Sequence, residues 1–515
     1  MGEQTLQGPD LKAGISVDSL PSGEKILGHA DGTPALLINQ NNHFYAVGAI
    51  CSHYSANLMD GILTEGTIHC PWHHSCFDLK TGDAQKAPAL NPIPTWRTEV
   101  ENGIVYAREK QEAPKAREGK VSKEHFVIVG SGAAGHAAAE MLRKEGFGGA
   151  ITMLSTDIEL PYDRPNLSKD YLAGTAPEEW MPLRPPEFYE EQKIKVRLKT
   201  KVTELKAQEK KLILEDGESL SFDKCLLAMG GSPVKPPIEG IDQTHVHFLR
   251  TFADCRSLIQ SLSPSKKIVV VGAGFIGLEA AASLRMRGSD VTVVAPDSLP
   301  LARIVEKEVG ELLKSVHEKN GVQFHLGHTV KKIEKDRVIL ENDESLKADV
   351  VLIGTGIKLN TSLAENANLR CDQGVLVDSF LKTSADDIYA AGDIARWPRN
   401  SSGKSARVEH WVVAQTQGQA AARNMLGQKQ AYLDVPFFWS QQFDVTINYV
   451  GYAGPWTSHK IFGDVDKKNC AVAFYDGDKV GAILTIGRDQ ECLHLAQAME
   501  KQDQKRIEGI LGGGR

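Results

Sequence analysis

Apolar and polar residues alternate in short runs over the first part of the chain. Residues 25–50 follow this period of two, interrupted by the turn dipeptides DG and NN. Residues 95–109 form two strand-like runs around Asn102-Gly103, which is a strong hairpin signal. The pattern predicts a small antiparallel β domain over residues 1–108.

A charged segment follows this domain. Residues 109–124 contain one proline and no apolar period, which is typical of a linker. From Phe126 onward, short apolar runs alternate with amphipathic helical stretches. That pattern predicts βαβ units built on parallel sheets.

Two stretches of the chain resemble each other. Residues 125–155 and residues 267–295 each consist of an apolar strand, a glycine-rich turn, a helix and a second strand. Each is followed by a strand that ends in another glycine-rich turn, at 225–237 and at 350–360. The arrangement predicts two dinucleotide-binding domains in tandem.

The pattern of apolar and polar residues changes once more near Phe437. Short strands return there and are followed by one helix at 491–502, which predicts a small α+β domain. The predicted division is a β domain over 1–108, a linker over 109–124, a first dinucleotide-binding domain in two parts over 125–243 and 369–430, a second one over 244–368, and a C-terminal domain over 431–515.

Composition narrows the functional classes. The chain has 515 residues, 41% of them hydrophobic, and a net charge of −7, which opposes sequence-independent nucleic-acid binding. No basic and apolar leader precedes the first domain, and no apolar run reaches the roughly 18 residues of a membrane helix. Eight scattered cysteines suit a reducing compartment. We therefore expect a cytoplasmic protein without a membrane span.

The first glycine motif is Gly130-x-Gly132-x-x-Gly135, between an apolar strand and a helix. Glycine permits the tight turn there and lets a pyrophosphate approach the free N–H groups at the helix start. We expect the second strand of this unit to end at Asp157, whose carboxylate would bind the ribose of the adenosine half. The alternative is an ordinary glycine turn in a βαβ unit.

The second motif, Gly272-x-Gly274-x-x-Gly277, repeats this arrangement. Ala295 stands where an acid would reject a 2′-phosphate, and Arg303 lies downstream, either to meet that phosphate or as a solvated surface residue. The pattern predicts a site for NADH or NADPH, with NADH favoured.

Three further segments, "LPYDRPNLSKDYL", "SADDIYAAGDIARWP" and "RVEHWVVAQTQGQAAARNML", carry a family resemblance. From about residue 122 to the end, the chain resembles the flavin-dependent ferredoxin reductases that serve aromatic-ring oxygenases and cytochromes P450. Apoptosis-inducing factor shares this architecture. The resemblance implies FAD in the first dinucleotide-binding domain and NADH or NADPH in the second.

The resemblance also implies roles for matching residues. Lys169 would pair with Glu279 beside the flavin, the helix beginning near Trp411 would point its N-terminus at the flavin, and Trp411 would lie near the isoalloxazine ring. The alternative interpretations are that Lys169 and Glu279 are ordinary surface charges and that Trp411 only packs against its neighbours. The remaining implied contacts are Arg164 and Asp393 toward FAD and Ile276 and Gly356 toward the nicotinamide nucleotide.

Disulfide-reducing flavoproteins place cysteines just after the first glycine motif. Here the first cysteine after Gly135 is Cys225, which fits a small buried residue of a strand. No thiol is placed to receive electrons from the flavin, so we expect another route.

Residues 51–76 offer that route. Cys51-x-His53 and Cys70-x-x-His73 each supply one thiolate and one imidazole, with sixteen residues between them. Zinc fingers pair like with like, whereas a two-iron cluster takes two cysteines on one iron and two histidines on the other. The order favours the [2Fe–2S] cluster, and zinc is the alternative.

The segment resembles the Rieske ferredoxin family. High-potential members carry a disulfide between the two loops, but Ala56 and Trp72 occupy those positions here, which leaves Cys76 as packing. Ser75 supplies one of the two hydroxyl donors of such loops, and Phe77 replaces the other, so we expect a low potential. His74 stands where relatives have glycine and His69 is expected on a strand surface.

The predicted fold class is therefore an all-β Rieske domain, two α/β Rossmann-type domains of glutathione-reductase type and a C-terminal α+β domain. The predicted function is electron transfer from NADH or NADPH through FAD to the in-chain [2Fe–2S] cluster, and then to an unknown one-electron acceptor: a P450, an oxygenase or a cytochrome. We expect a monomer or homodimer.

Three alternatives compete. A Rieske oxygenase needs a further iron site of two histidines and a carboxylate, and residues 243–249, expected in a loop, lack the carboxylate. An apoptosis-inducing-factor-like signalling or DNA-binding protein conflicts with the net charge of −7. A purely structural Rieske domain conflicts with the intact ligand set.

Overall fold

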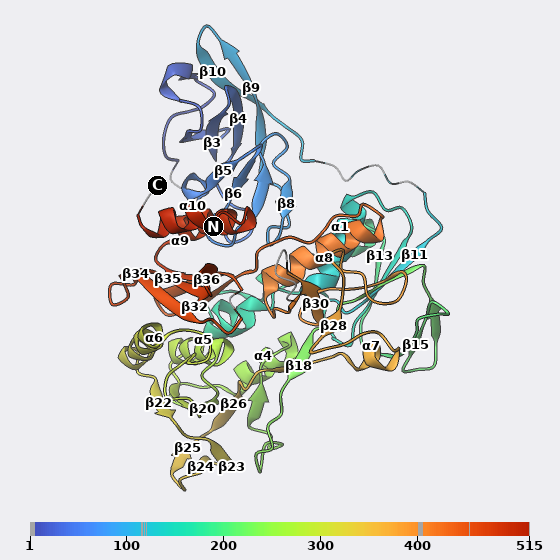
Figure 1. The fold of residues 1–515 in the computed structure, drawn as a ribbon, viewed down its shortest axis with the longest axis vertical. Coiled ribbons are helices and arrows are strands. Elements are labelled where there is room, and N and C mark those ends of the chain that lie inside the picture. The colour runs from blue at the N-terminus through green and yellow to red at the C-terminus, as the bar shows by residue number, and fades with distance from the viewer. Residues whose placement is uncertain are drawn as a thin grey trace.

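The computed structural model describes residues 6–114, 117, 119, 121–399, 405–452 and 454–513. The N-terminal domain stands above the rest of the molecule in Figure 1, with the C-terminal helices α9 (Asp489–Glu500) and α10 (Gln504–Leu511) directly beneath it. No helix among these residues is both long and apolar enough to cross a bilayer.

The N-terminal domain consists of two antiparallel sheets. Asn102 and Gly103 both adopt positive φ, 52° and 76°, in the predicted hairpin turn. The larger sheet has the order β1 (Ile15–Ser16), β10 (Ile104–Lys110), β9 (Thr95–Glu101), β4 (His43–Gly48), β3 (Thr33–Gln40) and β2 (Lys25–Ala30). The smaller sheet has the order β5 (Ile62–Thr64), β6 (Thr67–His69), β7 (Cys76–Asp78) and β8 (Ala84–Lys86).

The first dinucleotide-binding domain is built on a parallel sheet. Its order is β13 (Ile194–Arg197), β12 (Ala150–Leu154), β11 (His125–Val129), β17 (Lys224–Leu227) and β29 (Ile388–Ala390). Helices α1 (Ala133–Lys144) and α8 (Trp411–Met425) pack side by side (Figure 1). The expectation that β12 ends at Asp157 was wrong, because strand pairing ends at Leu154 and Ser155 turns toward residue 200. Cys225 is fully buried in β17, as predicted.

The second dinucleotide-binding domain repeats the plan. Its parallel sheet has the order β19 (Val246–Phe248), β26 (Val350–Ile353), β20 (Lys267–Val271), β21 (Asp290–Ala295) and β22 (Gln323–Leu326). Helix α4 (Phe252–Ser261) contacts β19, α5 (Phe275–Met286) follows the glycine motif and α6 (Lys307–Lys319) precedes β22. Residues 243–249 were expected in a loop, but part of them forms β19, because Val246–Phe248 completes the edge of this sheet beside β26.

The two dinucleotide-binding domains also contain smaller elements. Each domain carries a three-stranded antiparallel sheet, and a two-stranded ribbon connects them. The sheet strands are β14 (Val202–Lys206), β15 (Lys211–Leu214) and β16 (Ser219–Ser221), and β23 (Val330–Glu334), β24 (Arg337–Leu340) and β25 (Ser345–Lys347); the ribbon is β18 (Gly231–Pro233) and β27 (Ile357–Leu359). The short pieces are α2 (Asp170–Ala173), α3 (Pro186–Glu191), α7 (Ser362–Asn366), β28 (Val375–Leu376), β30 (Ala395–Pro398) and β31 (Ser405–Ala406).

The C-terminal domain is an antiparallel sheet with α9 and α10, which confirms the predicted α+β character. The strand order is β32 (Phe437–Gln442), β33 (Val445–Gly451), β36 (Lys479–Ile486), β35 (Asn469–Asp476) and β34 (Ser458–Asp464). One edge, β32, contacts both α5 and α8. Helix α9 also contacts β5. The C-terminal domain therefore touches the other three domains.

Candidate active site

Two loops of the N-terminal domain have the same backbone geometry. The amide of Cys51 donates to the carbonyl of Ala56 at 2.9 Å, and the amide of Cys70 donates to the carbonyl of Ser75 at 2.8 Å. Ser55 and His74, four residues after each cysteine, both adopt φ near +60° (61° and 62°). His74 thus occupies a left-handed position that favours glycine, as the turn interpretation expects.

The four predicted ligands meet as two pairs. The Nδ1 atoms of His53 and His73 lie 3.2 Å apart. The thiol of Cys70 donates to Cys51, which lowers the pKa of Cys51 and raises the pKa of Cys70. Among the described residues no three ligand groups converge on a single ion. Two separate pairs suit two irons better than one zinc ion.

Burial keeps both imidazoles neutral. It lowers the pKa of His53 to about 3 and holds the pKa of His73 well below its usual value. A histidine must be unprotonated to bind a metal, so the two rings are held in the competent state. The residues present therefore fit a Rieske cluster.

The neighbours of the ligands behave largely as structural residues. Ser75 is fully buried and donates its hydroxyl to Cys51, so one of the two expected donors is in place. Cys76 is buried and lies 3.5 Å from His69 Nε2. All eight cysteines are free in the structure, and Ala56 and Trp72 leave no bridge between the loops. The expected low potential stays a prediction.

Both glycine motifs have the backbone that a dinucleotide requires. Gly130 has φ +109°, and a Cβ on Gly135 would lie 1.8 Å from the Gly130 carbonyl oxygen. In the second motif Gly272 has φ +114°, and a Cβ on Gly277 would lie 2.2 Å from the Gly272 carbonyl oxygen. Larger residues are therefore excluded where the helix packs against the turn.

The guanidinium group of Arg164 lies next to the first glycine turn. The Arg164 guanidinium lies 3.8 Å from the position of a Cβ on Gly132, and its Nε is buried without a partner among the described residues. Such an unpaired donor beside a helix N-terminus fits a bound pyrophosphate. The site is thus suited to FAD.

The carboxylates of Asp157 and Asp393 both accept hydrogen bonds within the protein. The Asp157 carboxylate accepts from the Tyr162 hydroxyl at 2.7 Å and the Ile158 amide at 2.8 Å. Asp393 follows β29 and accepts from Arg250 Nη2 at 2.9 Å. Burial lowers the pKa of Arg250. Sequence reasoning missed Arg250, although its place just after a strand of the second domain was a usable signal.

The predicted pair of Lys169 and Glu279 is formed at a junction of three domains. Lys169 Nζ lies 2.7 Å from Glu279 Oε2, with both side chains largely buried. Ser168 donates to the same oxygen at 2.5 Å, and Ser440 of β32 donates to Oε1 at 2.7 Å. Glu279, in the second dinucleotide-binding domain, therefore accepts from groups of the first dinucleotide-binding domain and of the C-terminal domain.

Among the residues that the structure describes, none of the aromatic contacts at this junction involves Trp411. It is the first residue of α8, where the helix was expected to begin, and it packs half-buried against the core of the first dinucleotide-binding domain. The residue before it, His410, stacks on Phe438 at 4.0 Å.

The aromatic residue at the junction is Trp439, which the sequence did not single out. Its ring centroid lies 4.1 Å from that of His73 and 6.3 Å from that of His53. Lys169 Nζ lies 5.9 Å from the same ring. Trp439 thus touches a cluster ligand on one side and the Lys169–Glu279 pair on the other.

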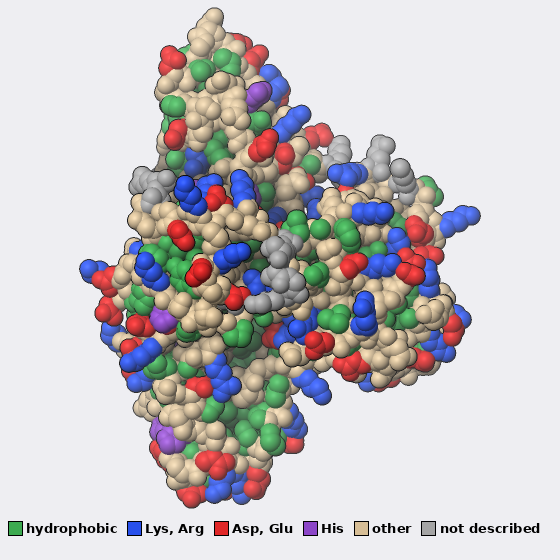
Figure 2. Space-filling view, in the orientation of Figure 1, with side chains coloured by type: hydrophobic (Ala, Val, Ile, Leu, Met, Phe, Trp, Pro, Cys, Tyr) green, Lys and Arg blue, Asp and Glu red, His purple; other side chains and the backbone are tan. Residues whose placement is uncertain are grey.

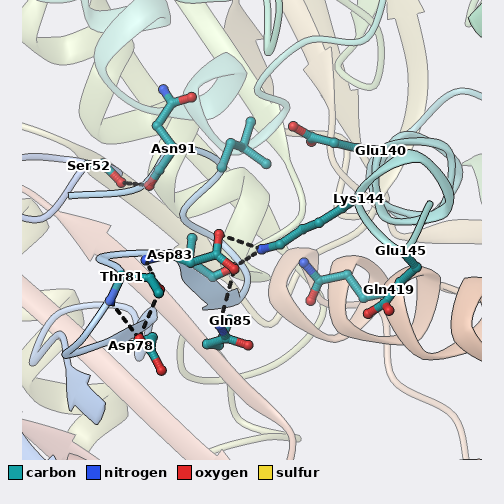
Figure 3. Close-up of polar contacts among 12 residues, drawn as sticks. Ser52, Asp78, Thr81, Asp83, Gln85, Asn91, Glu140, Lys144, Glu145 and Gln419 are labelled. Atoms are coloured by element: carbon teal, nitrogen blue, oxygen red, sulfur yellow. Dashed lines mark hydrogen bonds and ion pairs between the residues drawn. The ribbon is translucent and has the colours of Figure 1, made fainter. Parts of the chain in front are cut away.

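Several polar contacts hold the N-terminal domain against the first dinucleotide-binding domain and the C-terminal domain. Lys144 of α1 binds Asp83 at 2.8 Å and the Ala84 carbonyl at 2.6 Å (Figure 3). Lys86 binds Glu500 of α9 and Asp434 at 3.0 and 3.2 Å. The further contacts are Tyr54 with Asp163 and Asn166, Arg184 with Leu90 and Asn91, and Ala87 with Gln419.

The residues predicted for the nicotinamide nucleotide lie along one edge of the second domain. Ile276, in the first turn of α5, is 43% exposed, and Gly356 has φ +96° after β26. Ala295 ends β21, and Arg303 Nε binds Asp297 Oδ1 at 3.1 Å on the surface. Arg303 is thus tied to a surface acid that follows β21.

Family comparison agrees with this layout. Residues 124–418, more than half of the chain, match the pyridine nucleotide-disulphide oxidoreductase family. The chain belongs to that family. Residues 13–97 match the Rieske [2Fe-2S] domain, and residues 437–508 match the reductase C-terminal domain. The cofactors of this pyridine nucleotide-disulphide oxidoreductase are therefore FAD, NADH or NADPH as substrate, and a [2Fe–2S] cluster in place of the zinc alternative.

Relatives of this oxidoreductase cover all of its domains. Human "Apoptosis-inducing factor 3" is 32% identical over 90% of this chain and 80% of its own length. The ferredoxin–NAD(+) reductase component of the anthranilate 1,2-dioxygenase system of Burkholderia cepacia is 34% identical over 72% of this chain and 93% of its own. The crystal structure of the covalent putidaredoxin reductase–putidaredoxin complex superposes with a TM-score of 0.72 at 29% identity, over 76% of this chain and 99% of that one.

Proposed function

We propose that this protein takes electrons from NADH through FAD to its own Rieske cluster and passes them singly to an external acceptor. The relatives include ferredoxin–NAD(+) reductases, whose names separate the reductase from its ferredoxin. Here a Rieske domain and the reductase domains belong to one chain. Bound FAD supplies the conversion between a two-electron donor and a one-electron carrier.

The observation that carries the proposal is the position of Trp439. Its ring lies against His73, with centroids 4.1 Å apart, and under Lys169 Nζ at 5.9 Å. The delocalised electrons of an indole ring lower the barrier to electron tunnelling relative to a saturated side chain. Trp439 is thus the group that connects the flavin side of the junction with the cluster side.

The buried ion pair fixes this geometry. Glu279 accepts from Lys169 and from Ser440, the residue after Trp439. Because both contacts lie on one carboxylate, the ring of Trp439 and the amine of Lys169 keep their relative positions. We propose that Lys169 and Glu279 also border the nicotinamide, where they would orient it for hydride transfer and exclude water.

The surroundings support a reducing compartment and a protein acceptor. All eight cysteines are free, which is typical of cytoplasmic proteins. On the face shown in Figure 2, basic and acidic side chains are intermixed, and the net charge is −7. Neither feature favours the DNA-binding alternative, so we propose a cytoplasmic electron carrier that serves a P450, an oxygenase or a cytochrome.

Anaerobic reduction tests the proposal. The purified holoprotein is mixed with NADH, flavin absorbance is followed, and an EPR spectrum is recorded at the end. We expect flavin bleaching together with a rhombic signal whose mean g lies below the free-electron value. Bleaching with a silent cluster would contradict the in-chain route.

A further inference from the structure

The histidine ligands of the cluster are covered on the side of the reductase domains. His73 is only 7% exposed. Among the described residues, three aromatic rings pack against the two ligands: Tyr54 and Trp439 against both, and Trp72 against His73. The two imidazoles also pack against each other. An acceptor can therefore reach the histidine side of the cluster by way of one of these rings or of the partly exposed edge of His53.

Two of the rings, those of Trp439 and Tyr54, lie in the contact between the Rieske domain and the reductase domains. Trp439 belongs to β32 of the C-terminal domain. The Tyr54 hydroxyl donates to Asp163 and accepts from Asn166 Nδ2 at 2.9 Å, so its edge points into the first dinucleotide-binding domain. Neither ring is free to meet a second protein while the domains are together.

The third ring faces solvent. Trp72 is 44% exposed, and its ring centroid lies 6.3 Å from that of His73 at an interplanar angle of 77°. His73 therefore contacts both a half-buried tryptophan of the C-terminal domain and an exposed tryptophan of its own loop. Tryptophan is highly buried on average, and it is enriched among residues that dominate binding at protein interfaces.

We propose that Trp72 is the electron exit of this protein and the anchor on which its acceptor, a one-electron redox protein with an apolar surface beside its cofactor, docks. The inference rests on the proposed function and names the surface through which that function is completed. For each NADH oxidised to NAD⁺ and a proton, two acceptor molecules each gain one electron. The exit works while the Rieske domain stays docked on Trp439.

Variants at Trp72 separate this step from the earlier ones. The holoproteins W72A and W72F are compared with W180A, which removes a 71% exposed tryptophan. In the described part of the chain, no ring contact links Trp180 to the cluster ligands. Anaerobic reduction of ferricytochrome c, binding of ferricytochrome c by surface plasmon resonance, and the NADH-induced EPR signal are measured for each. The EPR signal reports the proposed function and the other two readouts report the exit.

We expect W72A to bind ferricytochrome c about 30-fold more weakly and to reduce it correspondingly more slowly. W72F should recover most of both losses, W180A should match the wild type, and all variants should form the cluster signal normally. Equal cytochrome c rates for W72A and the wild type, at whatever level, would overturn the exit. A cluster signal missing from every variant would overturn the proposed function instead.

A cross-link tests whether the docked arrangement is the productive one. In the variant D83C/K144C, a short bis-maleimide can join the two positions whose native side chains meet at 2.8 Å. The cross-linked protein should reduce ferricytochrome c as fast as the untreated variant. Loss of that rate with an intact EPR signal would show that the Rieske domain must leave the reductase, and would overturn Trp72 as the exit.

Discussion

The indole of Trp439 packs against the imidazole of His73, with ring centroids 4.1 Å apart at an angle of 48°. The two residues are far apart in sequence and belong to different domains, so the contact exists because the Rieske domain docks on the edge strand β32. Replacing Trp439 with alanine should slow reduction of the cluster by NADH at least about tenfold, a barrier increase of about 1.4 kcal/mol. Stopped-flow absorbance measures this rate.

W439F is the matched variant, because it keeps a ring between His73 and Lys169. It should lie between the wild type and W439A, while flavin reduction by NADH stays unchanged in both. An unchanged cluster rate in W439A would remove the ring from the pathway.

Loss of one imidazole should abolish the cluster but not the flavin chemistry. In H73A the Nδ1 atom that faces His53 at 3.2 Å is gone, so one iron lacks a ligand. We expect no Rieske EPR signal and wild-type flavin bleaching by NADH. The neighbouring variant H74G should keep the signal, since His74 adopts φ +62°, a conformation that glycine prefers. A cluster retained in H73A would show that the ligand set is wrong.

Breaking the junction pair should damage both stability and turnover. Lys169 and Glu279 are 12% and 5% exposed at the side chain, so removing one leaves a buried charge unpaired at a cost of about 3 to 5 kcal/mol. E279Q is the milder change because its amide can still bond to Lys169 and Ser440. We expect both K169A and E279Q to lower kcat/KM for NADH, with a lower melting temperature chiefly in K169A. Normal NADH kinetics in both would place the nicotinamide elsewhere.

Docking depends on Lys86, whose amine lies between two acids. Burial disfavours its charge, but Asp434 and Glu500 outweigh that effect and raise its pKa. In K86A these acids face each other without a cation, which should weaken docking and slow cluster reduction by NADH. The control is K80A, which removes an exposed lysine of the same domain. The rate of K86A should respond less steeply to added salt than that of the wild type, because the attraction that salt screens has been removed, and equal rates at all salt concentrations would contradict this role.

Glu306 gives the protein a pH-dependent stability. It is 3% exposed at the start of α6, neither carboxylate oxygen has a hydrogen-bond partner among the described residues, and burial raises its pKa to about 7. The unfolded chain ionises near pH 4.5, so this group's contribution is fully present below that pH and is lost as the pH rises through 7. Replacing Glu306 with glutamine should stabilise the protein by up to about 3 kcal/mol at pH 8 and little at pH 5.

Thermal melting at the two pH values measures the effect. The exposed Glu341 of the same domain supplies the control E341Q, which should melt like the wild type at both. Equal melting temperatures for E306Q and the wild type at pH 8 would show that Glu306 is ionised without cost.

The sequence predicted what local spacing determines. The glycine turns, the two Cys/His loops and the hairpin at Asn102-Gly103 each depend on a few consecutive residues, and each has the expected backbone. The Lys169–Glu279 contact was reached through the family resemblance, because 110 residues separate the two.

Contacts between domains were beyond such reasoning. "FFWSQQF" has the pattern of an ordinary strand, and nothing in it shows that Trp439 meets a ligand from the N-terminal domain. Tyr54 and Asp163 likewise meet across 109 residues. Arg250 was missed because its partner Asp393 lies in the other dinucleotide-binding domain. Docking of whole domains decides these pairs.

Transfer within one chain is tested most directly by a single-turnover experiment at several protein concentrations. Oxidised holoprotein is mixed anaerobically with NADH in a stopped-flow instrument, and the rate of cluster reduction after flavin bleaching is recorded. Since Trp439 and His73 already lie in contact, that rate should be first order and constant over a wide range of protein concentration. A rate that rises in proportion to protein concentration would show transfer between molecules and contradict the in-chain route.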